Sequence, residues 1–241
     1  MNDTYRVRAV TSAEWEEARL QLLAKEKDLT RARDALAADR RRMPWLKVDK
    51  EYLFDGPNGT VGLPDLFDGR RQLLLYRAFF EPGVSGWPDH ACVGCSLMAD
   101  QVAHLAHLNA RHTTLAFASR ATQPDIERVK ARMGWAAIPW YTLTDGFDVD
   151  FGVDEWYGTN AFIHDGDSVY RTYFINAREH EPMGGTLSSL DFTALGRQED
   201  WEDSPVGYPQ VPRFSWLNRH DEYGPTESSS HPITVDPQCD H

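Results

Sequence analysis

The first regular pattern along the chain is a narrow stripe of apolar residues near the N-terminus. Thr11 and Glu14 form a capping-box signature, and the apolar residues that follow repeat at the spacing of one helix face. Pro44 disfavours continuation of the helix. The members of the stripe are Trp15, Ala18, Leu22, Leu29, Ala32 and Leu36. The pattern predicts one helix over residues 12–42, in an N-terminal arm (1–45) that packs against the rest of the chain or against a second copy in a homodimer.

Beyond the arm, short apolar runs alternate with segments of helical periodicity. The expected strands are 72–80, 113–118, 140–143, 160–164 and 169–174, and the expected helices are 96–110, 124–133 and 188–195. Strands that alternate with helices imply right-handed crossovers and a largely parallel central sheet. Asp165-Gly166 then predicts a hairpin that adds an antiparallel edge. The expected fold class is α/β, with a central mixed sheet flanked by helices in a domain of residues 46–223, followed by a mobile polar tail (224–241).

Composition and charge exclude several classes of protein. The chain has 241 residues, of which 41% are hydrophobic, so it is long enough to bury a core. Residues 1–50 hold 12 basic and 9 acidic side chains, whereas the whole chain has a net charge of −12. An acidic body disfavours nucleic acid as a partner. No apolar run approaches the roughly 18 residues of a membrane span, and the N-terminus lacks a secretory signal pattern. We expect a cytoplasmic protein with no membrane partner.

Two of the three cysteines form a CxxC motif, Cys92 and Cys95, between a predicted buried strand and a predicted helix. In a cytosolic chain this arrangement points to redox chemistry. The unpaired amides and the dipole of a helix N-terminus stabilise a thiolate, and the second cysteine lies one turn away. Cys92 is therefore the expected nucleophile and Cys95 the resolving thiol, with no bound cofactor required.

Two other interpretations of the motif stay open. His90, Cys92 and Cys95 could be three ligands of a metal site. The fourth ligand would come from His104 with His107, or from Cys239 with His241. Alternatively, both cysteines could be buried and inert.

Several sequence blocks together resemble a known bacterial family. They are WPDHACVGCSLMAD from Trp87, HLAHLNARHTTLAFASRA, RMGW, FDVDFGV and HDGDSVYRTY. The combination resembles the thioredoxin-like bacterial family of uncharacterised proteins called domain of unknown function 899. The likeness runs from about residue 10 to the RHDEYG block at 219–224. It implies a thioredoxin fold with extensions and brings no established reaction.

One departure from thioredoxins in general concerns the substrate groove. Thioredoxin-like enzymes place a cis-proline opposite the CxxC, but the equivalent stretch here, residues 157–162, contains none, and Pro139 falls one element too early. The departure leaves room beside the cysteines for a metal or a small ligand. A peroxiredoxin is disfavoured, because Asp89 stands where its threonine would be.

Three residues are candidates for substrate binding. Trp87 shares the loop that presents Cys92, Thr159 lies in the stretch opposite the motif, and Arg120 follows the second buried strand, where open α/β sheets bind ligands. The sequence thus favours a thiol-disulfide oxidoreductase acting on a protein or small-molecule disulfide. The alternative is a non-catalytic thioredoxin-fold binding module that holds a metal through His90, Cys92 and Cys95.

Overall fold

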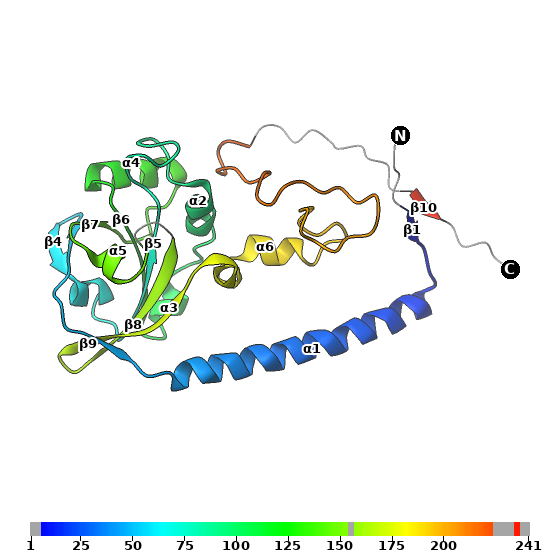
Figure 1. Cartoon of the computed structure of the whole chain (residues 1–241), viewed down its shortest axis with the longest axis horizontal. Helices are drawn as coiled ribbons and strands as arrows, with labels where there is room; N and C mark the ends of the chain where they lie inside the picture. Colours follow the sequence, from blue (N-terminus) through cyan, green and yellow to red (C-terminus); the bar gives the residue numbers. More distant parts are fainter. Residues whose placement is uncertain (1–5, 154–156, 224–233, 237–241) are drawn as a thin grey trace. The chain divides into compact units, whose positions relative to one another are not determined.

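The computed structural model describes residues 6–153, 157–223 and 234–236. Its contacts divide the chain into two units, and Figure 1 shows their elements. One unit holds Met1–Met43, Thr193–Trp216 and Pro225–His241. The other, which we call the body, holds Pro44–Phe192 and Leu217–Gly224, and both CxxC cysteines belong to it. Most of the tail predicted to be mobile, and Cys239, lie outside the described residues.

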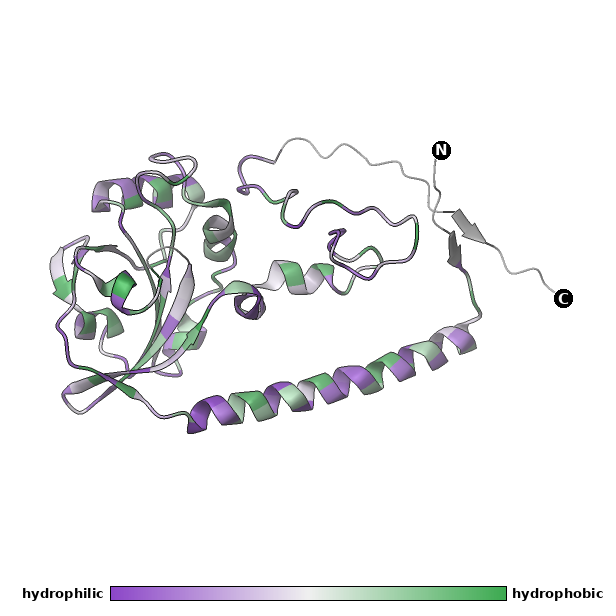
Figure 2. Cartoon of the chain, viewed as in Figure 1, coloured by the Kyte–Doolittle hydropathy of each residue, from purple (hydrophilic) through white to green (hydrophobic). Residues whose placement is uncertain are grey.

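The predicted N-terminal helix is confirmed as α1, Ser12–Arg42. The Thr11 hydroxyl accepts from the Glu14 amide at 3.3 Å, and the Glu14 carboxylate accepts from the Thr11 amide at 3.0 Å, so the capping box forms. No side chain of α1 is buried, and hydrophobic and hydrophilic residues alternate along it (Figure 2). The predicted pairing of this arm with a second copy stays a prediction. Before α1, the short strand β1 (Arg6–Arg8) pairs in parallel with β10 (Thr234–Asp236).

An eight-stranded mixed sheet forms the centre of the body, in the order β2-β9-β8-β5-β6-β7-β3-β4. The strands are β2 Leu46–Val48, β3 Leu53–Gly56, β4 Gly59–Gly62, β5 Gln72–Arg77, β6 Thr113–Ser119, β7 Trp140–Leu143, β8 Gly158–Asp165 and β9 Ser168–Ile175. β5, β6 and β7 run parallel, and the other pairings are antiparallel. The prediction of a largely parallel sheet is therefore wrong. The hairpin β8–β9 lies inside the sheet, because β2 adds beyond β9 and β8 pairs directly with β5.

The helices of the body match the prediction in part. They are α2 Val93–Asp100, α3 Ala106–Asn109, α4 Gln123–Met133, α5 Phe147–Asp150 and α6 Gly185–Leu190. Two short 3₁₀ helices are η1 Leu63–Phe67 and η2 Ala177–Met183. The start of α4 is capped by the Thr122 hydroxyl, and α4 ends at Gly134 with a φ of 74°, a left-handed conformation that glycine adopts without strain. The segment 188–195, predicted as a helix, is helical only in its first residues.

The prediction of a single helix over 96–110 is wrong, because the helix is interrupted between α2 and α3. The Gln101 side chain accepts from the Thr186 amide at 2.6 Å and donates to the Leu97 carbonyl at 3.0 Å. A new turn then begins after His104, whose Nδ1 accepts from the Ala106 amide at 3.2 Å. The partner that holds the break lies 85 residues along the chain, so no local periodicity could predict it.

Two hydrophobic cores lie on the two faces of the sheet. Successive side chains of a strand point to opposite faces, so Leu73 and Leu75 of β5 join one core and Tyr76 joins the other. The Tyr76 core also contains Cys95 from α2 and Ile126 from α4, which places both crossover helices on that face. A βαβ unit with the CxxC helix as its crossover, followed by an antiparallel hairpin beside the first strand, makes this a thioredoxin-like fold.

Candidate active site

Cys92 occupies the junction between the central strand and the crossover helix. The chain leaves β5 through residues 78–80, and the Cys92 amide donates to the Phe79 carbonyl at 3.0 Å. Cys92 is the N-cap residue of α2, with φ −48° and ψ 139°. Its side chain is partly buried, and it lies beside the unpaired amides of the first helical turn. The predicted location of the motif at a strand-to-helix junction is therefore confirmed.

Cys95 lies one turn further along α2 and is buried, with 2% of its surface exposed. Its Sγ accepts two hydrogen bonds, from the Tyr76 hydroxyl at 3.3 Å and from the Phe79 amide at 3.3 Å. Cys92 and Cys95 are both free thiols in this structure. One thiol is thus accessible, and the other is enclosed between two hydrogen-bond donors.

The two thiols have opposite acidities. The pKa of Cys92 is lowered to about 6, mainly by the hydrogen bond from the Cys95 thiol. The amides of Cys95 and Gly94 and the positive charge of Arg219 also lower it, whereas burial opposes them. The pKa of Cys95 is raised well above its ordinary value. The main cause is that the protonated Cys95 thiol donates a hydrogen bond to Cys92, and the second cause is burial. At neutral pH the accessible sulfur is the thiolate, which is the nucleophilic form.

We expect the rate of Cys92 alkylation by iodoacetamide to be half-maximal near pH 6, the pH at which half of its thiol is ionised. Because this pKa is depressed, the rate should fall as the pH drops below that value. Cys95 should stay unmodified over the same range. Peptide mass spectrometry across a pH series measures both sites, with Cys92→Ser as the control. A half-maximal rate at the roughly pH 8.5 of an ordinary thiol would contradict the expectation.

The comparison with protein families identifies the chain. Residues 4–223 match a family described as "Bacterial protein of unknown function (DUF899)". The chain belongs to this family. The matched region of this DUF899 member includes α1, the whole sheet and the segment that follows residue 216, so the family resemblance expected from the sequence blocks is confirmed.

Solved structures resemble this DUF899 member weakly. A hypothetical protein from Sinorhizobium meliloti 1021 has a TM-score of 0.35 at 16% identity, over 58% of this chain and 75% of that one. Sco1 from Thermus thermophilus has a TM-score of 0.34 at 14% identity, over 58% of this chain and 87% of that one. BsSco, a member of the Sco family of cytochrome c oxidase assembly proteins, has a TM-score of 0.33 at 12% identity, over 55% of this chain and 84% of that one. Likeness at these scores carries no argument about function. No curated protein matches the chain.

Two of the three candidate binding residues lie near the cysteines. The Trp87 ring packs at a tilt against the Phe80 ring, with centroids 5.1 Å apart. Both Trp87 and Cys92 pack against the core that contains Cys95. Thr159 is buried on β8, where it is the direct strand partner of Tyr76. Their roles in binding substrate stay predictions.

A cavity of about 320 Å³ lies on the face of the sheet that carries Tyr76. Met98, Leu115, Thr159 and His180 are among the residues that line it. The Thr159 hydroxyl and His180 Nε2 are 2.6 Å apart, and burial lowers the pKa of His180 to about 4. The imidazole is therefore neutral near pH 7, so it adds no charge to the wall of the cavity.

The other candidates are engaged elsewhere. Arg120 forms a two-point ion pair with the buried Asp148 and donates to the Asp145 carbonyl at 3.2 Å. The His90 ring contacts Arg132 and Glu222. Within the described part of the chain, no three His, Cys, Asp or Glu side chains converge as a metal ion would require. In the same part, no helix is long and apolar enough to cross a membrane.

Sequence reasoning missed two contributors to the site, Tyr76 and Arg219. A tyrosine inside the apolar run of β5 is a usable signal, because a buried hydroxyl needs a partner. For Arg219 the signal was the RHDEYG block itself, which marked the family but gave no indication of what it contacts.

Proposed function

We propose that the protein is a thiol-disulfide oxidoreductase in which Cys92 is the nucleophile and Cys95 the resolving thiol. The observation that carries the proposal is the asymmetry of the pair. Cys92 is a partly buried N-cap thiol with a pKa lowered to about 6, and Cys95 is a buried thiol that donates to it. A thiol with a lowered pKa at a helix N-terminus is typical of the nucleophile in disulfide exchange. The chemistry requires no bound cofactor.

In the first step, the Cys92 thiolate attacks one sulfur of the substrate disulfide. A bond forms between Cys92 Sγ and that sulfur, the substrate S–S bond breaks, and the other substrate sulfur leaves as a thiolate that takes up a proton. The protein is then joined to half of the substrate by a mixed disulfide. Cys95 is still a thiol at this stage, so the disulfide between Cys92 and Cys95 has not yet formed.

In the second step, Cys95 becomes the nucleophile. Once Cys92 is in a disulfide, it carries no negative charge, so one cause of the raised Cys95 pKa is gone. The Tyr76 hydroxyl and the Phe79 amide remain as donors that stabilise a Cys95 thiolate. Cys95 attacks Cys92 Sγ and releases the second substrate thiol. The substrate has gained two electrons, and an external dithiol must reduce the 92–95 disulfide again.

The test is a redox titration followed by turnover. The protein, with Cys239→Ser to remove the third cysteine, is equilibrated in glutathione buffers of increasing oxidised fraction, and free thiols are trapped with a maleimide. We expect both thiols to disappear together and reversibly, and the reduced protein to reduce a model disulfide when a dithiol is supplied. If the pair never forms a disulfide in excess oxidised glutathione, the proposal is wrong.

A further inference from the structure

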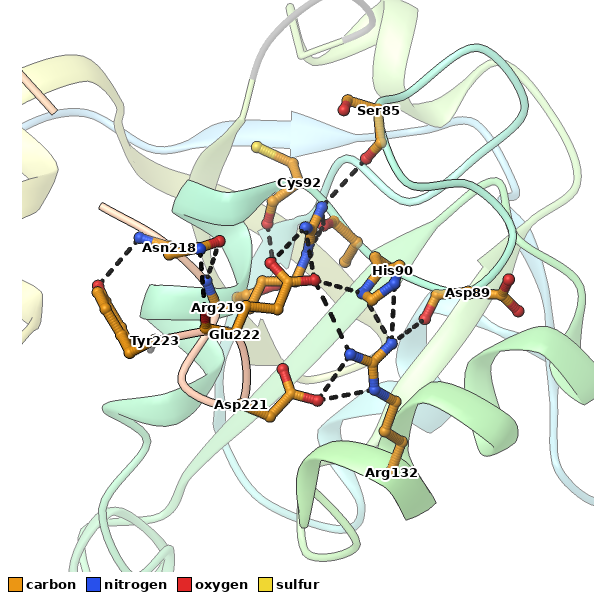
Figure 3. A network of polar contacts seen from close by, with 12 residues as sticks. Ser85, Asp89, His90, Cys92, Arg132, Asn218, Arg219, Asp221, Glu222 and Tyr223 are labelled. Carbon is orange, nitrogen blue, oxygen red and sulfur yellow. Dashed lines mark hydrogen bonds and ion pairs between the residues drawn. The ribbon is translucent and has the colours of Figure 1, made fainter. Parts of the chain in front are cut away.

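The loop that delivers the chain to Cys92 is held by arginines through its backbone carbonyls. Arg128 donates to the Pro88 carbonyl at 2.8 Å, and Arg132 donates to the Asp89 carbonyl at 3.2 Å. Both come from α4 and are partly exposed. The third is Arg219, from the segment Leu217–Gly224 at the far end of the body's sequence (Figure 3).

Arg219 makes the most extensive of these contacts. Its Nε and one terminal nitrogen donate to the Ala91 carbonyl at 2.9 and 2.8 Å, and the same terminal nitrogen donates to the Ser85 carbonyl at 3.2 Å. The side chain is only 9% exposed, so its charge needs partners. The loop backbone packs closely on it, because a Cβ at Gly86, where φ is +91°, would lie 2.8 Å from the guanidinium.

One carboxylate balances the Arg219 charge. Glu222 accepts from the other terminal nitrogen of Arg219 at 3.0 and 3.1 Å, and its Oε1 lies 3.1 Å from His90 Nδ1. Figure 3 shows this set beside Cys92. Asp221 pairs with Arg132, and the same arginine also lies 3.9 Å from Glu222 Oε1. A cation that is partly neutralised by a neighbouring anion still favours a nearby thiolate, but less than a free cation would.

These contacts let Arg219 act on Cys92 in two ways. Ala91 immediately precedes Cys92, so holding its carbonyl fixes where the N-cap sulfur lies. The same hydrogen bonds bring a buried positive charge to the thiolate, and the pKa of Cys92 is lowered partly by that charge. The carbonyls held by Arg128 and Arg132 lie further back in the loop. Arg219 is the cation among the main causes of the lowered pKa of Cys92.

We propose that Arg219 is a positioning residue for the Cys92 thiolate, that Glu222 moderates its charge, and that the segment 217–223 is therefore part of the active site. The inference rests on the proposed role of Cys92 as the nucleophile. It predicts effects of opposite sign for the two members of one ion pair, which general loosening of the loop would not produce.

The experiment measures the pH dependence of Cys92 alkylation in the full-length chain. We expect Arg219→Gln to raise the half-maximal pH by about half a unit, a roughly threefold slower reaction below pH 6, because the thiolate loses a partly neutralised cation. Glu222→Gln keeps a hydrogen-bonding side chain but removes the balancing charge, so it should lower the half-maximal pH. Arg219→Lys should recover part of the shift.

Arg128→Gln is the matched control, because it removes a positive charge that also binds a backbone carbonyl of this loop, that of Pro88. It should leave the half-maximal pH unchanged. Equal shifts in Arg128→Gln and Arg219→Gln, or shifts of the same sign in Arg219→Gln and Glu222→Gln, would overturn the inference. If the wild type itself titrates as an ordinary thiol, the proposed function fails. If the wild type titrates near pH 6 and Arg219→Gln does too, the proposed function stands and the role of Arg219 is wrong. Circular dichroism confirms that each variant is folded.

Discussion

Replacing Cys92 by serine should abolish reduction of a model disulfide, whereas replacing Cys95 by serine should stop the reaction one step later. Cys92 is the accessible thiolate, so without it no mixed disulfide can form. We expect at least about a thousandfold loss of turnover, because a serine hydroxyl is not ionised near neutral pH and attacks disulfides negligibly. In Cys95→Ser the first step survives, and the covalent adduct with half of the substrate should accumulate and be visible by intact mass.

The two variants together separate three interpretations of the motif. Inert cysteines predict no adduct in either variant and no turnover in the wild type. A metal-holding pair predicts that both variants lose bound metal and that neither forms an adduct. Tyr76→Phe gives a finer control, because it removes one donor to Cys95 Sγ and leaves the motif intact. It should slow release of the second thiol without changing the first step. An adduct that accumulates equally in Cys92→Ser would contradict the assignment of the nucleophile.

The local part of this site could be predicted from the sequence because it depends on neighbouring residues. A buried strand, a loop rich in glycine and proline, and a CxxC before a helical pattern place Cys92 at a helix N-terminus, whatever the rest of the chain does. The capping box at Thr11 and the left-handed Gly134 are local in the same way. In each case, the residues that set the conformation lie within one or two turns of it.

The remaining contributors depend on contacts between distant segments. Arg219 meets Ala91 across 128 residues, and Thr186 meets Gln101 across 85. The antiparallel strand β2 pairs with β9, although more than a hundred residues separate them. No periodicity encodes such partners, which explains why the sheet was expected to be largely parallel. Arg120 shows the same limit. An arginine at the end of a strand suggests a ligand contact, but this arginine is bound by the buried Asp148, which its own sequence position does not indicate.

The ion pairs of Asp148 lead to the second large effect, on stability. Asp148 is fully buried on α5, and it pairs with Arg120 and with Arg77, whose Nη2 lies 3.3 Å from Oδ2. Arg77 is itself 2% exposed and ends β5, just before the residues that contact Cys95. Removing the carboxylate leaves a buried guanidinium with Glu81 as its remaining carboxylate partner among the described residues. A buried charge that loses its partner costs far more than an exposed one.

We therefore expect Asp148→Asn to lower the free energy of unfolding by about 3 kcal/mol, within the range for breaking a buried pair. In a domain of this size, that loss corresponds to a fall in melting temperature of about 10 °C. Urea titration and calorimetry measure both quantities. Asp165→Asn is the matched control, because its pair with Arg71 is exposed on both sides and should cost less than about 1 kcal/mol. Equal losses in the two variants would show that burial of Asp148 adds nothing. Adding Arg77→Met to Asp148→Asn should recover part of the loss, because that double variant no longer buries an uncompensated cation at the end of β5.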